Sequence, residues 1–305
     1  MKTLFVFLFT LVSLSSVAAD RKLVLIAGQP SHGPGEHEHR AGCLLLQKCL
    51  AGTPGLLTVV IDQGWPTKPV DGHTVDDNSA LERADAIVIY ADGGRNHPAL
   101  VRDHIDVIQR LVKRGCGVGF IHYGTEPTKE RGETEFINWI GGAFETDWSV
   151  NPRWQPEFAP LPVHEVTHGV GPFSVSDEWY FHLRFSPDRR GITPILTAVP
   201  PASTMSRKDG PHEGNPSVRA AVAHGESQTV MWLLDRPDGG RGFGFTGGHY
   251  HPGWKDDNQR KLMLNTLLWL AKVPVPAGGV TSVVTEDDIT ANLDSIAEKK
   301  AVHNP

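Results

Sequence analysis

The sequence contains little cysteine, no block of basic residues and, beyond its first residues, no long apolar run. Its three cysteines, Cys43, Cys49 and Cys116, cannot form a disulfide framework, because their number is odd and their spacing is unlike a scaffold. The net charge of −6 and the isoelectric point of about 6.2 argue against a nucleic-acid partner. No segment after residue 19 is long and apolar enough to span a membrane, so we expect no membrane contact from the rest of the chain.

Several nucleotide and hydrolase motifs are also missing. No G-x-G-x-x-G follows the first expected strand, which argues against a dinucleotide-binding fold. The chain has neither a P-loop nor a G-x-S-x-G nucleophile turn. Histidine is abundant instead, with 15 residues, several of them beside glycine, proline or an acid.

The first residues have the layout of a secretory signal peptide. Lys2 precedes an apolar run from Leu4 to Val12, and small residues lead to Ala19 before Asp20. We therefore predict cleavage before Asp20 and an exported protein, periplasmic or extracellular; the alternative is an uncleaved anchor. The expected organisation is a signal peptide at 1–19, one domain at 20–276 and a C-terminal extension at 277–305.

Short apolar runs alternate with helical patterns in the first half of the chain. Such alternation is typical of a doubly wound α/β fold, with a mainly parallel sheet and helices on both faces. Ligands of such folds bind beyond the carboxyl ends of the strands. The pattern predicts strands at 22–27, 57–61, 86–90 and 117–121, and helices at 36–50, from 96–98 onward and at 133–141.

The second half predicts additions to this core. Residues 145–215 are rich in tryptophan, proline and histidine, and indicate irregular loops with antiparallel additions. A last long helix is expected from about residue 256, and 285–300 has the pattern of a small amphipathic helix. Further strands are predicted at 192–199, 218–223, 229–234 and 242–246.

Polar side chains follow several of the expected strands. His32 lies in the loop after the first strand, and Asp92 follows the strand at 86–90. His122 and Tyr123 follow the strand at 117–121, and His249 follows the strand at 242–246. Because parallel strands bring their carboxyl ends to one edge, we expect these side chains to meet there.

Neutral imidazole and carboxylate together suit zinc and similar divalent metals. No single spacing here is a metal motif, so the convergence depends on the fold. Each histidine also has an ordinary alternative as a surface or hydrogen-bonded loop residue. That alternative applies most to His37 and His39, because they fall on successive positions of the expected helix and do not face one another.

These segments together resemble the ThuA-like (trehalose-utilisation) family over roughly residues 22–275. The resemblance is carried by GQPSHGPGEHEHRAGCLLL, YADGGRNHP, GVGFIHYGTE, SVNPRW, DEWYFHLRF, TPILTA and RPDGGRGFGFTGGHYHPGW.

The resemblance implies a fold similar to the class I glutamine amidotransferases, and hence a flavodoxin-like core. In those enzymes a cysteine stands on the sharp turn after the strand that corresponds to GVGFI. Here His122 takes that place and Cys116 lies at the other end of the strand, so we expect no cysteine-dependent glutaminase activity. The family implies use of trehalose and related sugars, linked to 3-keto-sugar intermediates.

We therefore predict an enzyme that cleaves a small carbohydrate, a trehalose-related or 3-keto-glycoside substrate, by lyase- or hydrolase-type chemistry. A divalent metal would assist, with zinc as the first choice and manganese as the second. Glu178 would serve as a fourth ligand or as a general base, and a homo-oligomer is left open. The expected metal ligands are His32, His122, His249 and Glu178, catalysis falls to Glu178 and His122, and substrate contacts come from Asp92, Tyr123, Trp179 and His251.

Two other functions fit the same sequence. A non-catalytic sugar-binding or assembly module would keep the tryptophan-rich rim without needing converging histidines and acids. An amidotransferase-like hydrolase would need some other nucleophile. The tryptophans themselves have packing as their ordinary role.

Overall fold

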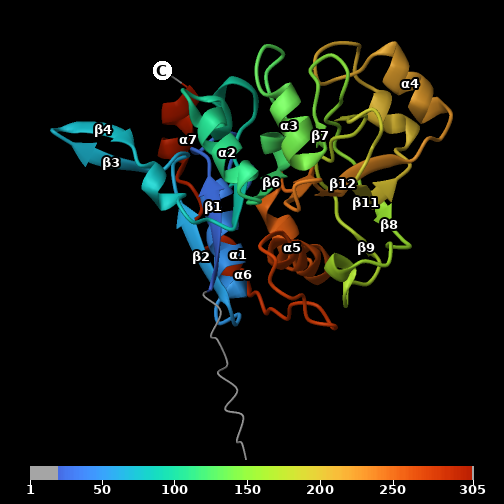
Figure 1. The fold of residues 1–305 in the computed structure, drawn as a ribbon. Coiled ribbons are helices and arrows are strands. Elements are labelled where there is room, and N and C mark those ends of the chain that lie inside the picture. Colours follow the sequence, from blue (N-terminus) through green and yellow to red (C-terminus); the bar gives the residue numbers. More distant parts are fainter. Residues whose placement is uncertain (1–19, 304–305) are drawn as a thin grey trace, which may run out of the picture.

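The computed structural model describes residues 20–303 and is built around a seven-stranded sheet (Figure 1). The strand order is β11-β12-β13-β6-β5-β1-β2. From β2 to β13 neighbouring strands run parallel, whereas β12 and β11 are antiparallel additions at one side. The strands are β1 (Arg21–Ala27), β2 (Leu56–Ile61), β5 (Ala86–Tyr90), β6 (Gly117–Ile121), β11 (Ile192–Ala198), β12 (Gln228–Asp235) and β13 (Arg241–Phe245).

Helices cover both faces of this sheet, because its central strands are apolar on both sides. Leu23 and Leu25 of β1 share one core with α1 (His39–Leu50) and α5 (Asp257–Leu270). Val24 and Ile26 point the other way, into a second core with α2 (His104–Lys113) and α3 (Glu133–Ile140). Alternate side chains of one strand therefore serve two cores. The predicted flavodoxin-like α/β fold is confirmed.

Smaller elements surround the sheet. The β3–β4 hairpin, which sequence analysis did not predict, projects from the body of the molecule (Figure 1). Residues 145–215 contain mainly loops and short antiparallel pairs, as expected. The remaining elements are β3 (Thr67–Val70), β4 (His73–Asp76), β7 (Gly142–Ala143), β8 (Glu157–Phe158), β9 (Phe173–Ser174), β10 (Arg184–Phe185), α4 (Pro216–Ala223), α6 (Glu286–Thr290) and α7 (Ile296–His303).

The strand predicted at 218–223 is wrong, because this segment forms α4. The Asn215 side chain accepts a hydrogen bond from the Val218 amide, and Pro216 occupies the first helical turn. An N-cap and a proline at this position favour a helix. The run Val-Arg-Ala-Ala-Val-Ala is short and mostly apolar, and such a run does not distinguish a strand from a helix.

Three predicted helices differ in their limits. The helix expected from residue 36 begins at His39, because His37 has a left-handed backbone with φ of 48°. The helix expected from 96–98 starts only at His104, after a single 3₁₀ turn at Pro98–Leu100. The extension forms two short helices, α6 and α7, on either side of Asn292, whose φ is 61°.

The predicted signal peptide, residues 1–19, lies outside the described residues. Among residues 20–303 no helix has the length and apolar character needed to cross a membrane.

Candidate functional site

The candidate site lies at the edge of the sheet where four parallel strands end. The loop after β1 (residues 28–38, the β1 loop) lies beside Asp92, which follows β5. His122 follows β6 directly, and His249 belongs to the segment after β13 (residues 246–250, the β13 loop). Parallel strands place these four connections together, as the sequence predicted.

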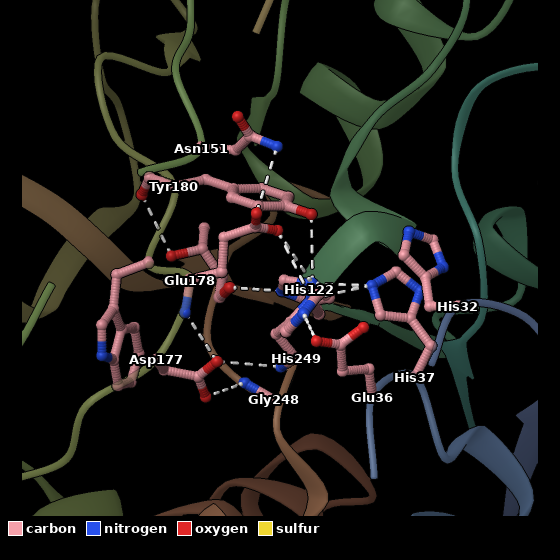
Figure 2. A network of polar contacts seen from close by, with 12 residues as sticks. His32, Glu36, His37, His122, Asn151, Asp177, Glu178, Tyr180, Gly248 and His249 are labelled. Carbon is pink, nitrogen blue, oxygen red and sulfur yellow. Dashed lines mark hydrogen bonds and ion pairs between the residues drawn. The ribbon is translucent and has the colours of Figure 1, made fainter. Parts of the chain in front are cut away.

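Three imidazole nitrogens converge at this edge (Figure 2). Nε2 of His37 lies 3.0 Å from Nδ1 of His249, and Nε2 of His122 lies 3.2 Å from each of these two atoms. All three rings are buried. The predicted proximity of His122 and His249 is confirmed, and His37 is the third member of this group, called here the histidine cluster.

The outer nitrogen of each cluster ring faces an acceptor. Nδ1 of His122 lies 2.8 Å from the Thr246 carbonyl oxygen, and Nδ1 of His37 lies 2.7 Å from the Asp92 carboxylate. Nε2 of His249 lies 3.6 Å from the Glu36 carboxylate, which is too far for a hydrogen bond. An outer nitrogen that donates its proton leaves a lone pair on the inner nitrogen. His37 and His122 therefore direct inner lone pairs into the cluster, where the inner nitrogen of His249 faces both of them.

Burial keeps these rings neutral. It is the largest cause that lowers the pKa of His37 and of His122 well below the ordinary value, and the neighbouring imidazoles add to it. Burial also lowers the pKa of His249 to about 4, although the nearby Glu36 carboxylate opposes this shift. Neutral imidazole is the form that binds metals.

The donor set fits a divalent cation such as zinc. Nitrogens that bind one zinc ion tetrahedrally at about 2.0–2.1 Å lie about 3.3–3.4 Å apart. The separations here are 3.0–3.2 Å. Carboxylate and carbonyl partners on the outer nitrogens are the usual second contacts of metal-binding histidines.

Glu178 reaches the same point from the segment between β9 and β10. Its Oε2 lies 3.4 Å from Nδ1 of His249 and 3.8 Å from Nε2 of His122, while Oε1 contacts the Asn151 amide at 3.5 Å. Burial is the main cause that raises the pKa of Glu178 to about 7. The side chain keeps 15% of its surface exposed, so a ligand outside the cluster can touch it.

Tyr180 is a site residue that sequence analysis missed. Its hydroxyl lies 3.1 Å from Nε2 of His122, and the two rings are 4.6 Å apart. Burial raises the pKa of Tyr180 well above its ordinary value, so the hydroxyl stays protonated. The pattern Asp-Glu-Trp-Tyr could have indicated it, because in an extended segment every second side chain points to the same face. Tyr180 therefore points to the same side as Glu178.

His37 stands where we expected His32. The His32 ring stacks on the His37 ring at 3.6 Å, and Figure 2 shows His37 between it and His122. His32 instead groups with His37 and Asp92. The physical reason is the late start of α1: the His37 amide donates to the His249 carbonyl oxygen at 2.9 Å, which turns its side chain toward the cluster. In the sequence, only the Gly33-Pro34-Gly35 segment before His37 indicates that the helix could begin later.

The predicted substrate contacts divide into two groups. Asp92 and Tyr123 remain partly exposed at the site, although the Asp92 carboxylate also fixes His37 and accepts from Ser31. Trp179 and His251 are buried, so neither side chain offers surface to a substrate in this structure. Trp179 packs against Phe245 in the core and its indole nitrogen donates to a backbone carbonyl.

Several site histidines have a strained backbone. His32, His37 and His122 have φ values of 59°, 48° and 55°. Left-handed conformations outside glycine each cost about 1–3 kcal/mol and tend to occur at functional sites. The backbone at Gly93 also packs closely against that at Tyr123: a Cβ at Gly93 would lie 2.3 Å from the Tyr123 carbonyl oxygen.

Cys116 lies away from this edge. It precedes β6, whereas His122 follows that strand. The thiol is buried, and this burial raises its pKa to about 12. A buried neutral thiol is a poor nucleophile.

Comparison with known proteins gives a family and a fold. The pattern of the family described as ThuA: Trehalose utilisation matches residues 49–270. No curated protein matches the chain. A solved structure described as a ThuA-like protein from Bacteroides uniformis is similar, with a TM-score of 0.55, 16% identity, and 85% of this chain and 95% of that chain covered. Another, from Parabacteroides merdae, has a TM-score of 0.51, 18% identity, and coverages of 88% and 94%.

Proposed function

The chain belongs to the ThuA (trehalose utilisation) family, and on this premise we propose that it is an exported enzyme that cleaves a small trehalose-related or 3-keto-glycoside substrate with the help of a divalent metal. The histidine cluster would hold the metal. The observation that carries the proposal is the meeting of three neutral imidazole nitrogens within 3.0–3.2 Å, beside the Glu178 carboxylate.

The residues around the cluster supply the other parts of such a site. Glu178 stands at the edge of the cluster with an oxygen available for a proton. Asp92, with 19% of its side chain exposed, and Tyr123 offer polar groups to sugar hydroxyls. The partly exposed His32 ring covers His37 on the outer side. These groups let a polar ring be oriented next to the cluster.

The proposed reaction is an elimination from a 3-keto-glycoside. His37, His122 and His249 would hold the divalent ion, which would supply polarisation of the ketone and so make the neighbouring C–H more acidic. Glu178 takes that proton, the electrons of the C–H bond form a carbon–carbon double bond, and the glycosidic C–O bond breaks. Water protonates the departing oxygen and Glu178 returns its proton to the hydroxide formed, so 3-keto-trehalose would release glucose and an unsaturated keto sugar.

Metal content and turnover test the proposal directly. Purified protein, dialysed with zinc or manganese and then freed of excess metal, should retain about one ion per chain. It should release glucose from 3-keto-trehalose, and a chelator should stop that release until the metal is restored. Folded protein that retains metal but leaves the substrate intact would contradict the proposed reaction alone.

Alanine variants test which histidines hold the metal. His37→Ala, His122→Ala and His249→Ala should each weaken zinc affinity by more than about a hundredfold, because each removes a ligand. His32→Ala should weaken it by less than about tenfold, because that ring stacks on His37 and lies outside the cluster. His224→Ala is the matched control, since its ring is exposed at the end of α4. Equal losses in His32→Ala and His37→Ala would contradict the cluster.

A non-catalytic sugar-binding module is the other candidate, and it needs no metal. Sugar binding that is unchanged by chelation, together with no turnover, would favour it. Export is tested separately: protein from its native host should have a mass that lacks residues 1–19.

A further inference from the structure

The C-terminal extension places a buried lysine against the β1 loop. Lys299 lies on α7, which sits beyond the carboxyl end of β1 (Figure 1), and only 4% of its side chain is exposed. Its ammonium group donates to the carbonyl oxygens of Ser31, Gly33 and Glu36 at 3.2, 2.9 and 2.6 Å. A lysine has only three N–H donors, and this one directs them at one loop.

The charge of Lys299 is matched by a buried carboxylate at the end of the same loop. Oε1 of Glu38 lies 2.9 Å from the ammonium nitrogen and accepts from the Gly35 amide at 2.9 Å. Oε2 of Glu38 accepts from the Asp294 amide, in the chain before α7, at 2.7 Å. Only 1% of the Glu38 side chain is exposed, so the two charges neutralise each other away from water.

The β1 loop needs such support because it forms little regular structure of its own. It contains the left-handed residues His32, Gly35 and His37. Within it the Glu36 amide bonds the Gly33 carbonyl, whereas the His37 amide bonds the distant His249 carbonyl. Carbonyl groups that point out of such a loop require partners from elsewhere. Lys299 provides a single partner for three of them.

Other contacts hold the extension in place without Lys299. The Lys48–Asp288 and Lys255–Glu286 ion pairs join α6 to α1 and to the turn before α5. Arg40 donates to the Asn292 carbonyl oxygen at 3.2 Å. Ile289 is buried in the core that α1 and α5 share. The contacts of Lys299 with the β1 loop can therefore be removed while the rest of the extension stays bound to the domain.

We propose that Lys299 is a positioning residue: by binding the backbone of the β1 loop it keeps His37 directed at His122 and His249, so the C-terminal extension completes the site. The grip on the loop is independent of the function proposed above, whereas its effect on metal binding rests on that function. The Lys299–Glu38 pair acts through His37 and touches no substrate.

The test uses the full mature chain and two variants. Lys299→Met alone leaves the buried Glu38 carboxylate without a counter-charge and is expected to destabilise the protein. Lys299→Met/Glu38→Gln removes both charges, and the glutamine side chain keeps one acceptor at this position. Lys255→Ala breaks an exposed ion pair of the same extension and is the matched control. Hydrogen exchange by mass spectrometry follows a peptide over residues 28–38, and a chelator competition measures zinc affinity.

The double variant should unfold cooperatively, with a midpoint close to that of the wild type. Exchange in the peptide over residues 28–38 should be at least about tenfold faster than in wild type, because its carbonyls lose their partner. Zinc affinity should fall by about ten- to a hundredfold, the usual effect of disturbing the residues that orient a metal ligand. Lys255→Ala should change neither value.

Unchanged exchange over residues 28–38 in the folded double variant would overturn the positioning role, whatever zinc does. Faster exchange with unaltered zinc affinity would show a loop that is held but a cluster that does not need it, which also overturns the proposal. A wild-type protein that binds no zinc would refute the metal part of the proposed function, while the exchange measurement would still decide whether Lys299 holds the loop.

Discussion

Two loops bring a histidine to the cluster, and opposite charges hold their backbones. The β13 loop presents its N–H groups to the buried Asp177 carboxylate, which accepts from Gly248 and His249 at 2.7 and 3.1 Å (Figure 2). It also accepts from the Tyr250 amide at 3.4 Å. The β1 loop presents its carbonyl oxygens to the buried Lys299 ammonium. One loop surrounds an anion and the other surrounds a cation.

The two charged groups differ in where they come from. Asp177 lies inside the body of the domain, in a segment paired with Trp154, and is fully buried. Lys299 lies on α7, near the end of the described chain. Removing the anion therefore disturbs the domain itself, whereas removing the cation frees an end that can detach locally. Similar geometry should give different energetic consequences.

The largest effect is expected for Asp177→Ala. The change leaves the N–H groups of Glu178, Gly248, His249 and Tyr250 without this acceptor. Unsatisfied buried donors cost about 1–3 kcal/mol each, so we expect a loss of at least about 3 kcal/mol in the free energy of unfolding. Urea unfolding followed by tryptophan fluorescence measures it. Asp188→Ala, at an exposed position, is the control. Equal stability of these two variants would mean that the carboxylate does not hold the β13 loop.

Lys299→Met should cost less, about 2 kcal/mol in the same measurement. Breaking a buried pair usually costs about 3–5 kcal/mol, but α7 can detach and let water reach Glu38. Lys255→Ala should stay within about 0.5 kcal/mol, because its ion pair is exposed. A loss in Lys299→Met greater than in Asp177→Ala would remove the distinction between a core anchor and a terminal one.

Each of the two loops carries one histidine of the cluster, and the two rings differ in the contact that their outer nitrogen makes. His37 is fixed by a 2.7 Å hydrogen bond to Asp92, whereas His249 has only a carboxylate at 3.6 Å, that of Glu36. Asp92→Asn should therefore weaken zinc affinity by about tenfold or more, and Glu36→Gln by less than about threefold. Competition with a chelator measures both. The reverse order would show that His249 depends more on its outer partner.

The smallest effect is expected in the pH dependence of stability, and it comes from Asp294 in the chain before α7. Burial, followed by the charge of Glu38, raises the pKa of Asp294 to about 6 from an ordinary value of 3.8. Between these values the unfolded chain has already lost the proton, so stability falls as pH rises through this window. Asp294 is half-buried and solvent screens it, so the change should be less than about 1 kcal/mol.

Asp294→Asn removes this titration. The variant should gain stability relative to wild type as the pH rises from 4 to 7, in paired urea unfolding curves. A gap that is constant over this range would show that Asp294 titrates as it does in the unfolded chain.

The central sheet and part of the site were predictable from sequence. Apolar runs such as AIVIY and GVGFI identified buried parallel strands, and the rule that strand ends share one edge placed His122 beside His249. Glu178 also lies where we expected it, although its segment has no regular structure. These predictions succeeded because they depend on local pattern and on topology.

The remaining site residues depend on backbone turns and on distant contacts. The periodicity of residues 36–50 extended the helix through His37, but its left-handed φ ends that regularity and exchanges His37 for His32. Lys299 lies in the run Ala-Glu-Lys-Lys-Ala, which has the composition of a solvent-exposed helix. Its partner carbonyls lie up to 268 positions away, and backbone groups leave no mark in the sequence.

The distance along the chain between Lys299 and Ser31 also sets an order of assembly. Synthesis proceeds from the N-terminus at about 5–20 residues per second, so the β1 loop emerges roughly 13 to 50 seconds before the lysine that clasps it, over a separation of 268 residues. His249 is made 218 residues after Ser31 and 50 residues before Lys299, so it is only in roughly the last 2.5 to 10 seconds that the strands, His122 and His249 can all be in place while His37 is not yet held. The site is thus completed by nearly the last residue of the described chain to be made, and a truncated product would carry the fold without the finished centre.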